Sequence, residues 1–263
     1  MSAAFPSVAP EVRVCKDAAA LARNVAAQCY RLACQAVAQA GRFTLVLAGG
    51  NTPRATYALL AAEPYRSAMP WAQTHVFWGD ERVVPPQHPE SNYRMAYETL
   101  LAHVAIPAAN VHRIPAERGA EAAAADYERT VREFFGLQDT AWPHFDLILL
   151  GLGRDGHTAS LFPGSPALYE SRRLVVATWV PQLQAYRLTL TPPVLCQARH
   201  VLFVVSGRDK AAAVRRVLCG PYRPARYPAQ LVRPSHGQLL WYLDDAAAAQ
   251  LKGTGYFLPA AEN

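Results

Sequence analysis

Residues 43–53 read FTLVLAGGNTP, a strand-like run that passes through two glycines into a helix start. Phe43 to Leu47 predicts a short β-strand buried on both faces, because its residues do not alternate between polar and apolar. Pro53 suits the first position of a helix, with Thr52 as its N-cap. A buried strand that leads directly into a helix is the repeating unit of parallel α/β sheets.

The same unit recurs along the chain. Further strands are predicted at residues 75–78, 145–150, 174–178, 186–190 and 200–205, and at a sheet edge at 239–243. Helices are predicted at 17–40, from 53, at 92–103, 117–135 and 209–218, and after the cap Asp244. This alternation predicts a three-layer α/β/α sandwich, with a mainly parallel, Rossmann-like sheet and helices on both faces. No linker-like tract divides the chain, so we expect a single α/β domain over residues 1–263.

The composition favours a compact globular protein. Of the 263 residues, 51% are hydrophobic and 17% are charged, which excludes a disordered chain. The five cysteines are an odd number and form no C-x-x-C pair, which is typical of a reducing compartment. There is no secretion signal and no run of eighteen apolar residues. We therefore expect a cytoplasmic protein with no membrane partner.

Positive charge is concentrated near the carboxyl end. Eight basic residues lie between Arg199 and Arg233, with Asp209 as the only acid among them, and the whole chain carries +6. Such a field suits either a nucleic acid or a small anionic substrate. Because no regular aromatic interleaving and no recognisable binding module accompany it, we expect no nucleic-acid partner.

Three polar loops follow the predicted strands, and in a parallel sheet such loops gather at one edge, where ligands bind. The first, Gly49-Gly50-Asn51-Thr52, places backbone N–H groups at a helix start, which suits a phosphate but also an ordinary tight turn. It lacks the lysine of a nucleotide-binding loop. The second, Gly79 to Arg82, carries Asp80 and Glu81, either as part of a site or as a surface ion pair.

The third loop begins with Gly151 and formally matches G-x-G-x-x-G. The prolines at 163 and 166 interrupt the helix that a dinucleotide site requires, which argues against that cofactor. The loop also holds Asp155 and His157, a carboxylate and an imidazole that can act together as a general base. No His–Cys spacing suits a metal and no G-x-S-x-G motif occurs, so we expect water as the nucleophile, with no metal and no cofactor.

In order, type and spacing, these loops resemble the motifs of the 6-phosphogluconolactonase family, which belongs to the oxidative pentose phosphate pathway. The resemblance rests on residues 47–53, 78–85 with 91–93, and 151–164, with weaker matches at 186–191 and 207–210. Asn51 departs from it, because the family usually has Ser or Thr there. The resemblance implies a fold shared with glucosamine-6-phosphate deaminases, and hydrolysis of a sugar-phosphate lactone by a carboxylic ester hydrolase.

The resemblance also implies roles for individual residues. The substrate phosphate is expected on Gly49, Gly50, Asn51 and Thr52, with Arg82, Arg187 and Lys210 as charge partners. His157 is expected to activate water, Asp155 to hold the imidazole, and Asp80 to contact sugar hydroxyls. We expect the chain to act as a monomer or weak homo-oligomer.

Two alternatives remain open at this point. A glucosamine-6-phosphate deaminase would place a glutamate five residues after the histidine, where this chain has Phe162, and typically an aromatic residue at Arg82. A sugar-phosphate-sensing regulatory domain would normally add a helix-turn-helix segment, whereas the first forty residues predict one helix.

Overall fold

A computed structural model describes residues 9–138 and 140–255, in which the strands form one large parallel sheet and one small antiparallel sheet. The large sheet has the order β1-β9-β8-β5-β2-β3, and all of its neighbouring strands run parallel. Its strands are β1 (Glu11–Cys15), β2 (Phe43–Leu47), β3 (Thr74–Trp78), β5 (Leu147–Leu150), β8 (His200–Val205) and β9 (Gln238–Asp244). The small sheet has the order β4 (Asp80–Arg82), β7 (Ala185–Leu190) and β6 (Val175–Val180).

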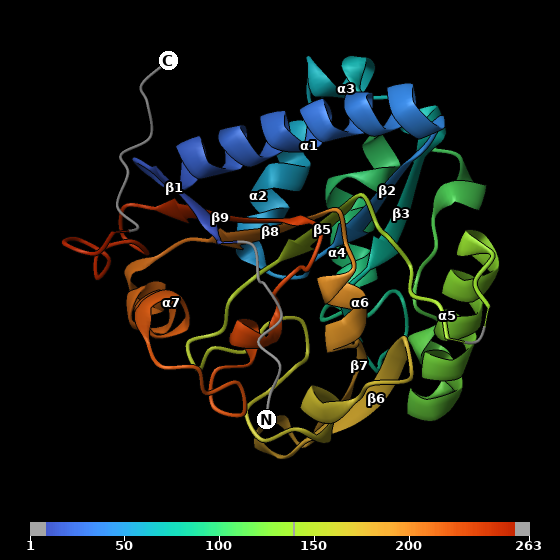
Figure 1. Ribbon diagram of the computed structural model, residues 1–263. Coiled ribbons are helices and arrows are strands. Elements are labelled where there is room, and N and C mark those ends of the chain that lie inside the picture. Colours follow the sequence, from blue (N-terminus) through green and yellow to red (C-terminus); the bar gives the residue numbers. More distant parts are fainter. Residues whose placement is uncertain (1–8, 139, 256–263) are drawn as a thin grey trace.

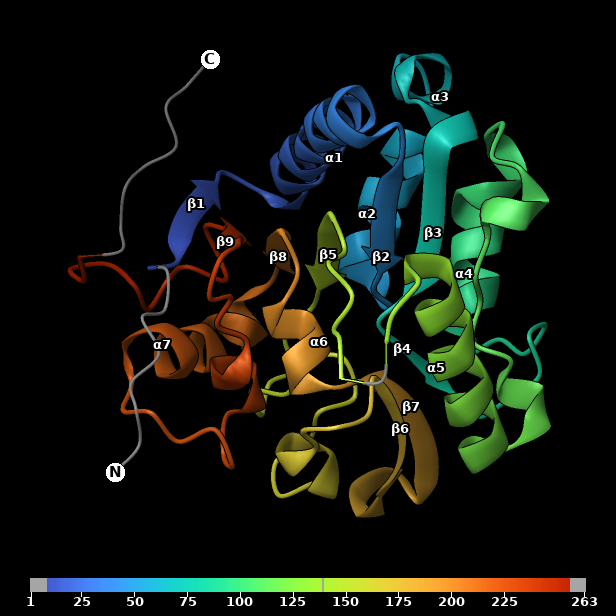
Figure 2. The same cartoon turned by 45° about the vertical axis from the view of Figure 1, so that its right-hand side comes forward.

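Helices cover both faces of the large sheet, which confirms the predicted three-layer architecture. The helices are α1 (Ala18–Ala40), α2 (Asn51–Leu60), α3 (Tyr65–Ala68), α4 (Asn92–Thr99), α5 (Ala120–Phe135), α6 (Pro192–Cys196) and α7 (Ala211–Cys219). Figures 1 and 2 show α1 and α2 on one side of the sheet, and α6, α7 and the small sheet on the other. Every residue of β2 and of β5 is buried, as expected of strands covered on both faces.

The chain reverses its direction of winding between β2 and β5. From β2 it continues outward to β3, whereas from β5 it returns through β8 toward β9. The two connections therefore leave these neighbouring strands toward opposite faces. In open α/β sheets such a reversal opens a crevice at the carboxyl ends of the strands, where ligands bind.

Several predicted elements need correction. The strand β9 is not at an edge, because the unpredicted strand β1 pairs with its outer side. Asp244 accepts a hydrogen bond from the N–H of Ala247, but within the described residues only turns follow it, not a terminal helix. Its carboxylate is shared with the N–H of Gly207, which ties it to the loop after β8.

Two further differences lie beside the predicted site. The N-cap of α2 is Gly50, with φ +101°, so the helix begins at Asn51, and Thr52 and Pro53 lie within its first turn instead of at its start. The predicted strands at 174–178 and 186–190 belong to the small antiparallel sheet, not to the parallel one. The two strands pair with each other, and β7 also pairs with β4, in a stretch predicted as loop.

Candidate active site

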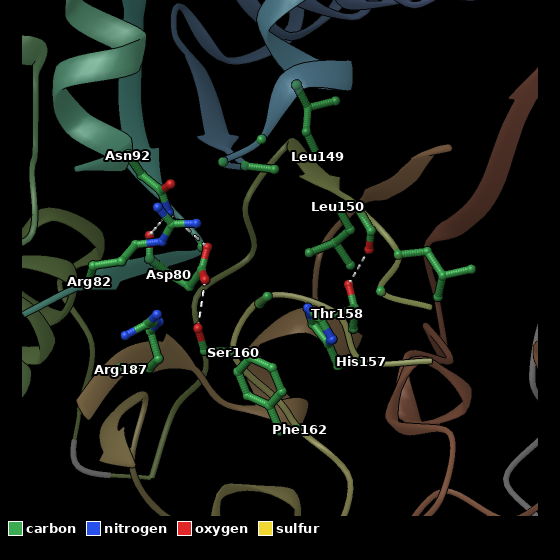
Figure 3. Close-up of a pocket in the computed structure, with 18 of the residues that line it drawn as sticks. Asp80, Arg82, Asn92, Leu149, Leu150, His157, Thr158, Ser160, Phe162 and Arg187 are labelled. Carbon is green, nitrogen blue, oxygen red and sulfur yellow. Dashed lines mark hydrogen bonds between the residues drawn. The ribbon is translucent and has the colours of Figure 1, made fainter. Parts of the chain in front are cut away.

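The loops after β2, β3 and β5 meet around a cavity of about 420 Å³, as expected from parallel strands (Figure 3). Leu183 in the turn between β6 and β7, Arg187 on β7 and Lys210 in the loop after β8 complete its wall. The residues that line it are Ala48, Gly49, Gly50, Gly79, Asp80, Arg82, Asn92, Leu149, Leu150, Gly151, Leu152, Gly153, His157, Thr158, Ala159, Ser160, Phe162, Leu183, Arg187 and Lys210.

Two buried tyrosines hold the ends of β2 and β3. The hydroxyl of Tyr57, on α2, accepts a hydrogen bond from the N–H of Ala48 and donates one to its carbonyl. The hydroxyl of Tyr127, on α5, does the same for Trp78. Burial raises the pKa of both phenols, so both remain protonated and able to donate. Two of the site's loops therefore start from backbone that helices on either side of the sheet keep in place.

Gly49 leaves room for a side chain from another element. A Cβ added to it would lie 2.0 Å from Oδ1 of Asn92, the first residue of α4. Gly50 has φ +101°, a conformation that L-residues rarely adopt. The two glycines thus serve a close approach and a left-handed turn, respectively, at the start of α2.

Asp80 connects three elements at one side of the cavity. Its Oδ2 accepts a hydrogen bond of 2.7 Å from the hydroxyl of Ser160, and its Oδ1 accepts one of 3.2 Å from Nδ2 of Asn92 (Figure 3). Neither Ser160 nor Asn92 was predicted as a site residue. Both lie within the stretches that carry the family resemblance, which is the signal that could have identified them.

Glu81, the second acid of this loop, is 2% exposed and faces the start of α4 instead of the cavity. Its carboxylate accepts hydrogen bonds from the N–H groups of Arg82, Asn92 and Tyr93. Burial raises the pKa of Glu81, and these donors counteract that rise. Glu81 therefore caps helix α4. Its hydrogen bonds also fix the backbone of Arg82 and Asn92, which both line the cavity.

The third loop carries the imidazole. Nδ1 of His157 lies 2.6 Å from Oδ1 of Asp155, which also accepts the backbone N–H of His157. A carboxylate only accepts, so Nδ1 carries the proton and the neutral ring presents Nε2 as the basic nitrogen. Burial by itself would raise the pKa of Asp155, but the hydrogen bond and charge of His157 outweigh it and hold the pKa below its ordinary value.

The backbone of this loop leaves space for the side chains of His157 and Asp155. A Cβ on Gly153 would lie 2.1 Å from Nδ1 of His157 and 2.6 Å from Oδ1 of Asp155, so the pair packs directly on the glycine. Ala159 has φ +46°, which is unusual for a residue with a side chain. Such strain is typical of functional sites, where the surrounding structure holds it in place. The ring of Phe162 lies 4.3 Å from that of His157.

Three cations face the cavity. Arg82 and Arg187 are direct cross-strand partners on β4 and β7, and neither forms an ion pair with a carboxylate in the part of the chain that the structure describes. Burial lowers the pKa of Arg187, and the positive charge of Arg82 lowers it further. Lys210 lies in the loop after β8, with Nζ 3.9 Å from Asp209. Like charges that face each other without a counter-ion suit an anionic ligand.

The predicted site residues thus divide into three groups. Those that line the cavity are Gly49, Gly50, Asp80, Arg82, His157, Arg187 and Lys210. Asp155 lies behind His157 and outside the lining. Asn51 lines a neighbouring hollow of about 390 Å³, and the side chain of Thr52 lines neither.

Between residues 9 and 255, leaving out 139, no three His, Cys, Asp or Glu side chains cluster as a metal site would require. Over the same ranges no helix has the length and apolar character needed to cross a membrane.

Comparison with known proteins relates this chain to a family of sugar-phosphate enzymes. The family model for glucosamine-6-phosphate isomerases and 6-phosphogluconolactonase matches residues 16–241. A 6-phosphogluconolactonase of Synechocystis sp. is 45% identical over 219 residues, covering 83% of this chain and 88% of that protein. The 6-phosphogluconolactonase structure from Trypanosoma cruzi superposes with a TM-score of 0.84 at 29% identity, over 95% of this chain and all of that one.

The fold is also similar to that of an enzyme with a different activity. The structure of a monomeric glucosamine-6-phosphate deaminase superposes with a TM-score of 0.75 at 23% identity, over 91% of this chain and 99% of that one. At that identity the likeness concerns the fold alone.

Proposed function

Since this chain belongs to the glucosamine-6-phosphate isomerase and 6-phosphogluconolactonase family, we propose that it hydrolyses 6-phospho-D-glucono-1,5-lactone to 6-phospho-D-gluconate. The observation that carries the proposal is one cavity that combines a carboxylate-oriented imidazole, His157, with the unpaired cations Arg82 and Arg187. Figure 3 shows the two arginines beside each other, with His157 across the cavity from them. A lactone that carries a phosphate needs a base at one end and cations at the other.

His157 acts as the general base. Its Nε2 takes a proton from water while the water oxygen bonds to the lactone carbonyl carbon, and Asp155 stabilises the imidazolium that forms. The tetrahedral oxyanion is stabilised by N–H groups of the loop. On collapse the bond from carbon to the ring oxygen breaks, and His157 returns its proton to that oxygen. Water is the only co-reactant: its hydroxyl group joins the carbonyl carbon and its proton joins the ring oxygen.

The phosphate binds at the N-terminus of α2. Gly50 caps this helix without a side-chain hydrogen bond, so the N–H groups that follow, including those of Asn51 and Thr52, are available to an anion. Arg82, Arg187 and Lys210 add positive charge. Asp80, held by Ser160 and Asn92, contacts the sugar hydroxyls.

Phe162 favours the lactonase over the deaminase. It packs on the His157 ring, at the position where the deaminase-like motif has a glutamate. A phenyl ring cannot exchange the proton that opening of a sugar ring requires. The regulatory-domain alternative has no comparable observation in its favour.

The direct test is the decay of freshly prepared 6-phospho-D-glucono-1,5-lactone with and without the protein. We expect acceleration of the phosphorylated lactone, much weaker acceleration of the unphosphorylated one, and no effect of EDTA. No acceleration would contradict the proposal, and ammonia release from glucosamine 6-phosphate would then support the deaminase. Inhibition by EDTA would contradict the metal-free mechanism.

Replacement of the base gives a second test. We expect His157→Ala to lower kcat about 10²- to 10⁴-fold, the usual contribution of a general base. His144→Ala is the control, because that exposed imidazole bonds only the carbonyl of Gln197 and is outside the cavity. Turnover by His157→Ala close to that of the wild type, above the spontaneous rate, would show that the base lies elsewhere.

We also propose that the protein is cytoplasmic and acts as a monomer or weak homo-oligomer. All five cysteines of the chain lie within the described residues and are free thiols, which supports a reducing compartment. The base, its orienting carboxylate and the three cations that the proposed reaction uses all come from one chain, which supports a site that needs no residue of a partner.

A further inference from the structure

The segment 221–231 packs against the side of the His157 loop that faces away from the cavity. The N–H of Ala229 donates to the carbonyl of Gly156 over 2.9 Å, and the N–H of Gly164 donates to the carbonyl of Ala225 over 3.0 Å. These two bonds hold both ends of the stretch that contains His157. No residue of segment 221–231 lines the cavity.

Tyr227 packs directly against Gly156. A Cβ added to Gly156 would lie 3.0 Å from Cδ1 and 3.2 Å from Cα of Tyr227. Gly156 has φ +85° and stands between Asp155 and His157 in the chain, so this contact is next to the hydrogen-bonded pair. The phenol hydroxyl has no hydrogen bond among the described residues. Tyr227 therefore contacts the His157 loop through the packing of its ring and not through its hydroxyl.

The segment is fastened to the body of the protein from its other side. Gln230 is 3% exposed, and its Oε1 accepts the N–H of Arg223 over 2.7 Å. Its Nε2 donates to the carbonyls of Arg216, near the end of α7, and Pro221. The guanidinium of Arg216 also lies 6.0 Å from the centre of the Tyr227 ring. A buried side chain with this many backbone partners makes the segment a rigid support.

We infer that Tyr227 is a positioning residue, which holds Gly156 so that Asp155 and His157 keep the alignment needed for proton transfer. This inference rests on the proposed function of the same site. Tyr227 acts through the loop and does not touch the substrate, because it lies outside the cavity. The phosphate contacts come from other elements, so loss of the ring affects the chemical step more than binding.

The kinetic test compares Tyr227→Ala with Tyr227→Phe. We expect the alanine variant to lower kcat at least about tenfold, since a misplacement of 1 Å at a catalytic group costs up to about a hundredfold. KM should change less than about twofold, and the phenylalanine variant should retain wild-type kcat, because the ring remains. Gln230→Ala, which loosens the same support, should lower kcat in the same way. Gln28→Ala is the control, a similarly buried glutamine on α1 outside the site.

A second readout does not depend on activity. Amide hydrogen exchange followed by mass spectrometry should rise across residues 151–164 in Tyr227→Ala and Gln230→Ala, and stay at the wild-type level there in Tyr227→Phe and Gln28→Ala. Exchange that rises only across 221–231, with unchanged kcat, would overturn the inference. So would equal losses of kcat in the Ala and Phe variants. If the wild type fails to hydrolyse the lactone, the proposed function fails, while the exchange pattern still decides whether Tyr227 holds the loop.

Discussion

Gly153 illustrates how much of the site depends on a missing side chain. The hydrogen-bonded pair of His157 and Asp155 lies on its α-carbon, closer than any Cβ would permit. In the sequence this glycine looked like part of a formal dinucleotide-binding motif. The structure explains it by close approach of side chains instead of by a cofactor.

Gly153→Ala should therefore lower activity without unfolding the protein. The backbone at Gly153 is not left-handed, so alanine is tolerated locally, but its Cβ must displace the imidazole or the carboxylate. We expect kcat to fall about 10- to 100-fold, with a Tm within a few degrees of the wild type, measured by the lactone assay and by thermal unfolding. Gly255→Ala, outside the cavity and at a position where an added Cβ meets nothing within 4 Å, should have a much smaller effect. Equal effects of the two substitutions would contradict the prediction that a Cβ at Gly153 displaces the imidazole or the carboxylate.

At the scale of elements, the pairing of β4 with β7 brings together the two arginines of the proposed anion site. It sets Arg82 opposite Arg187, whereas like charges in directly opposite positions destabilise a sheet. The short strand β4 follows β3 after Gly79, whose carbonyl accepts the N–H of Leu190, the last residue of β7. The two arginines are therefore held together by backbone hydrogen bonds and not by their side chains.

Arg187→Gln tests this arrangement through both activity and stability. Because the charged form of Arg187 is disfavoured by burial and by Arg82, removing the charge should leave Tm unchanged or higher, while KM rises about tenfold or more, the usual loss with a charged hydrogen bond. Inorganic phosphate should raise the Tm of the wild type more than that of the variant. Arg23→Gln, on the exposed face of α1, is the control for the loss of one charge. A lower Tm with an unchanged KM would show that Arg187 is structural.

At the scale of the whole molecule, the edge of the sheet formed by β3 contains a histidine pair. Nδ1 of His75, on β3, lies 3.3 Å from Nε2 of His112, and both rings pack with Phe134 of α5. Burial lowers the pKa of both imidazoles, for His112 to about 4, with a further contribution from the charge of His75. Both rings are therefore neutral in the folded protein at neutral pH.

This pair predicts a loss of stability in mild acid. The unfolded chain binds a proton at His112 near pH 6.5, whereas the folded protein does so only toward pH 4, so the free energy of unfolding falls as the pH drops from 6.5 to 4. The lowered pKa of His75 acts in the same direction. For a partly exposed ring the contribution is about 1 kcal/mol. His112→Phe should reduce the difference between Tm at pH 7 and at pH 4.5, whereas His144→Ala should not. An unchanged difference in His112→Phe would exclude the pair as its source.

The sequence predicted those features that follow from local pattern. Runs such as 43–47 and 145–150 indicated strands covered on both faces, and the loops after them had to meet because parallel strands end at one edge. This confirmed convergence brought His157, Asp80 and Gly49 to one cavity. The single domain over residues 1–263 and the individual roles of the site residues stay predictions.

Other features escaped prediction because they depend on pairing between distant segments. The strand β1 has only five residues, and its place outside β9 is set by contacts across more than two hundred positions of the chain. Asn92 and Ser160 lie within stretches that resemble the family, but their contacts with Asp80 come from separate segments that only the fold brings together.

By itself, therefore, the sequence determined the α/β class and the family, and it predicted His157 as the base, because periodicity, glycine-rich turns and the Asp155–His157 spacing are local properties. Only the tertiary structure decided which cations face the cavity, that Glu81 caps a helix instead of lining the cavity, and that Tyr227 packs against the loop of His157. The reason is that burial, register and close approach arise between segments far apart in the chain, and no short stretch encodes them separately.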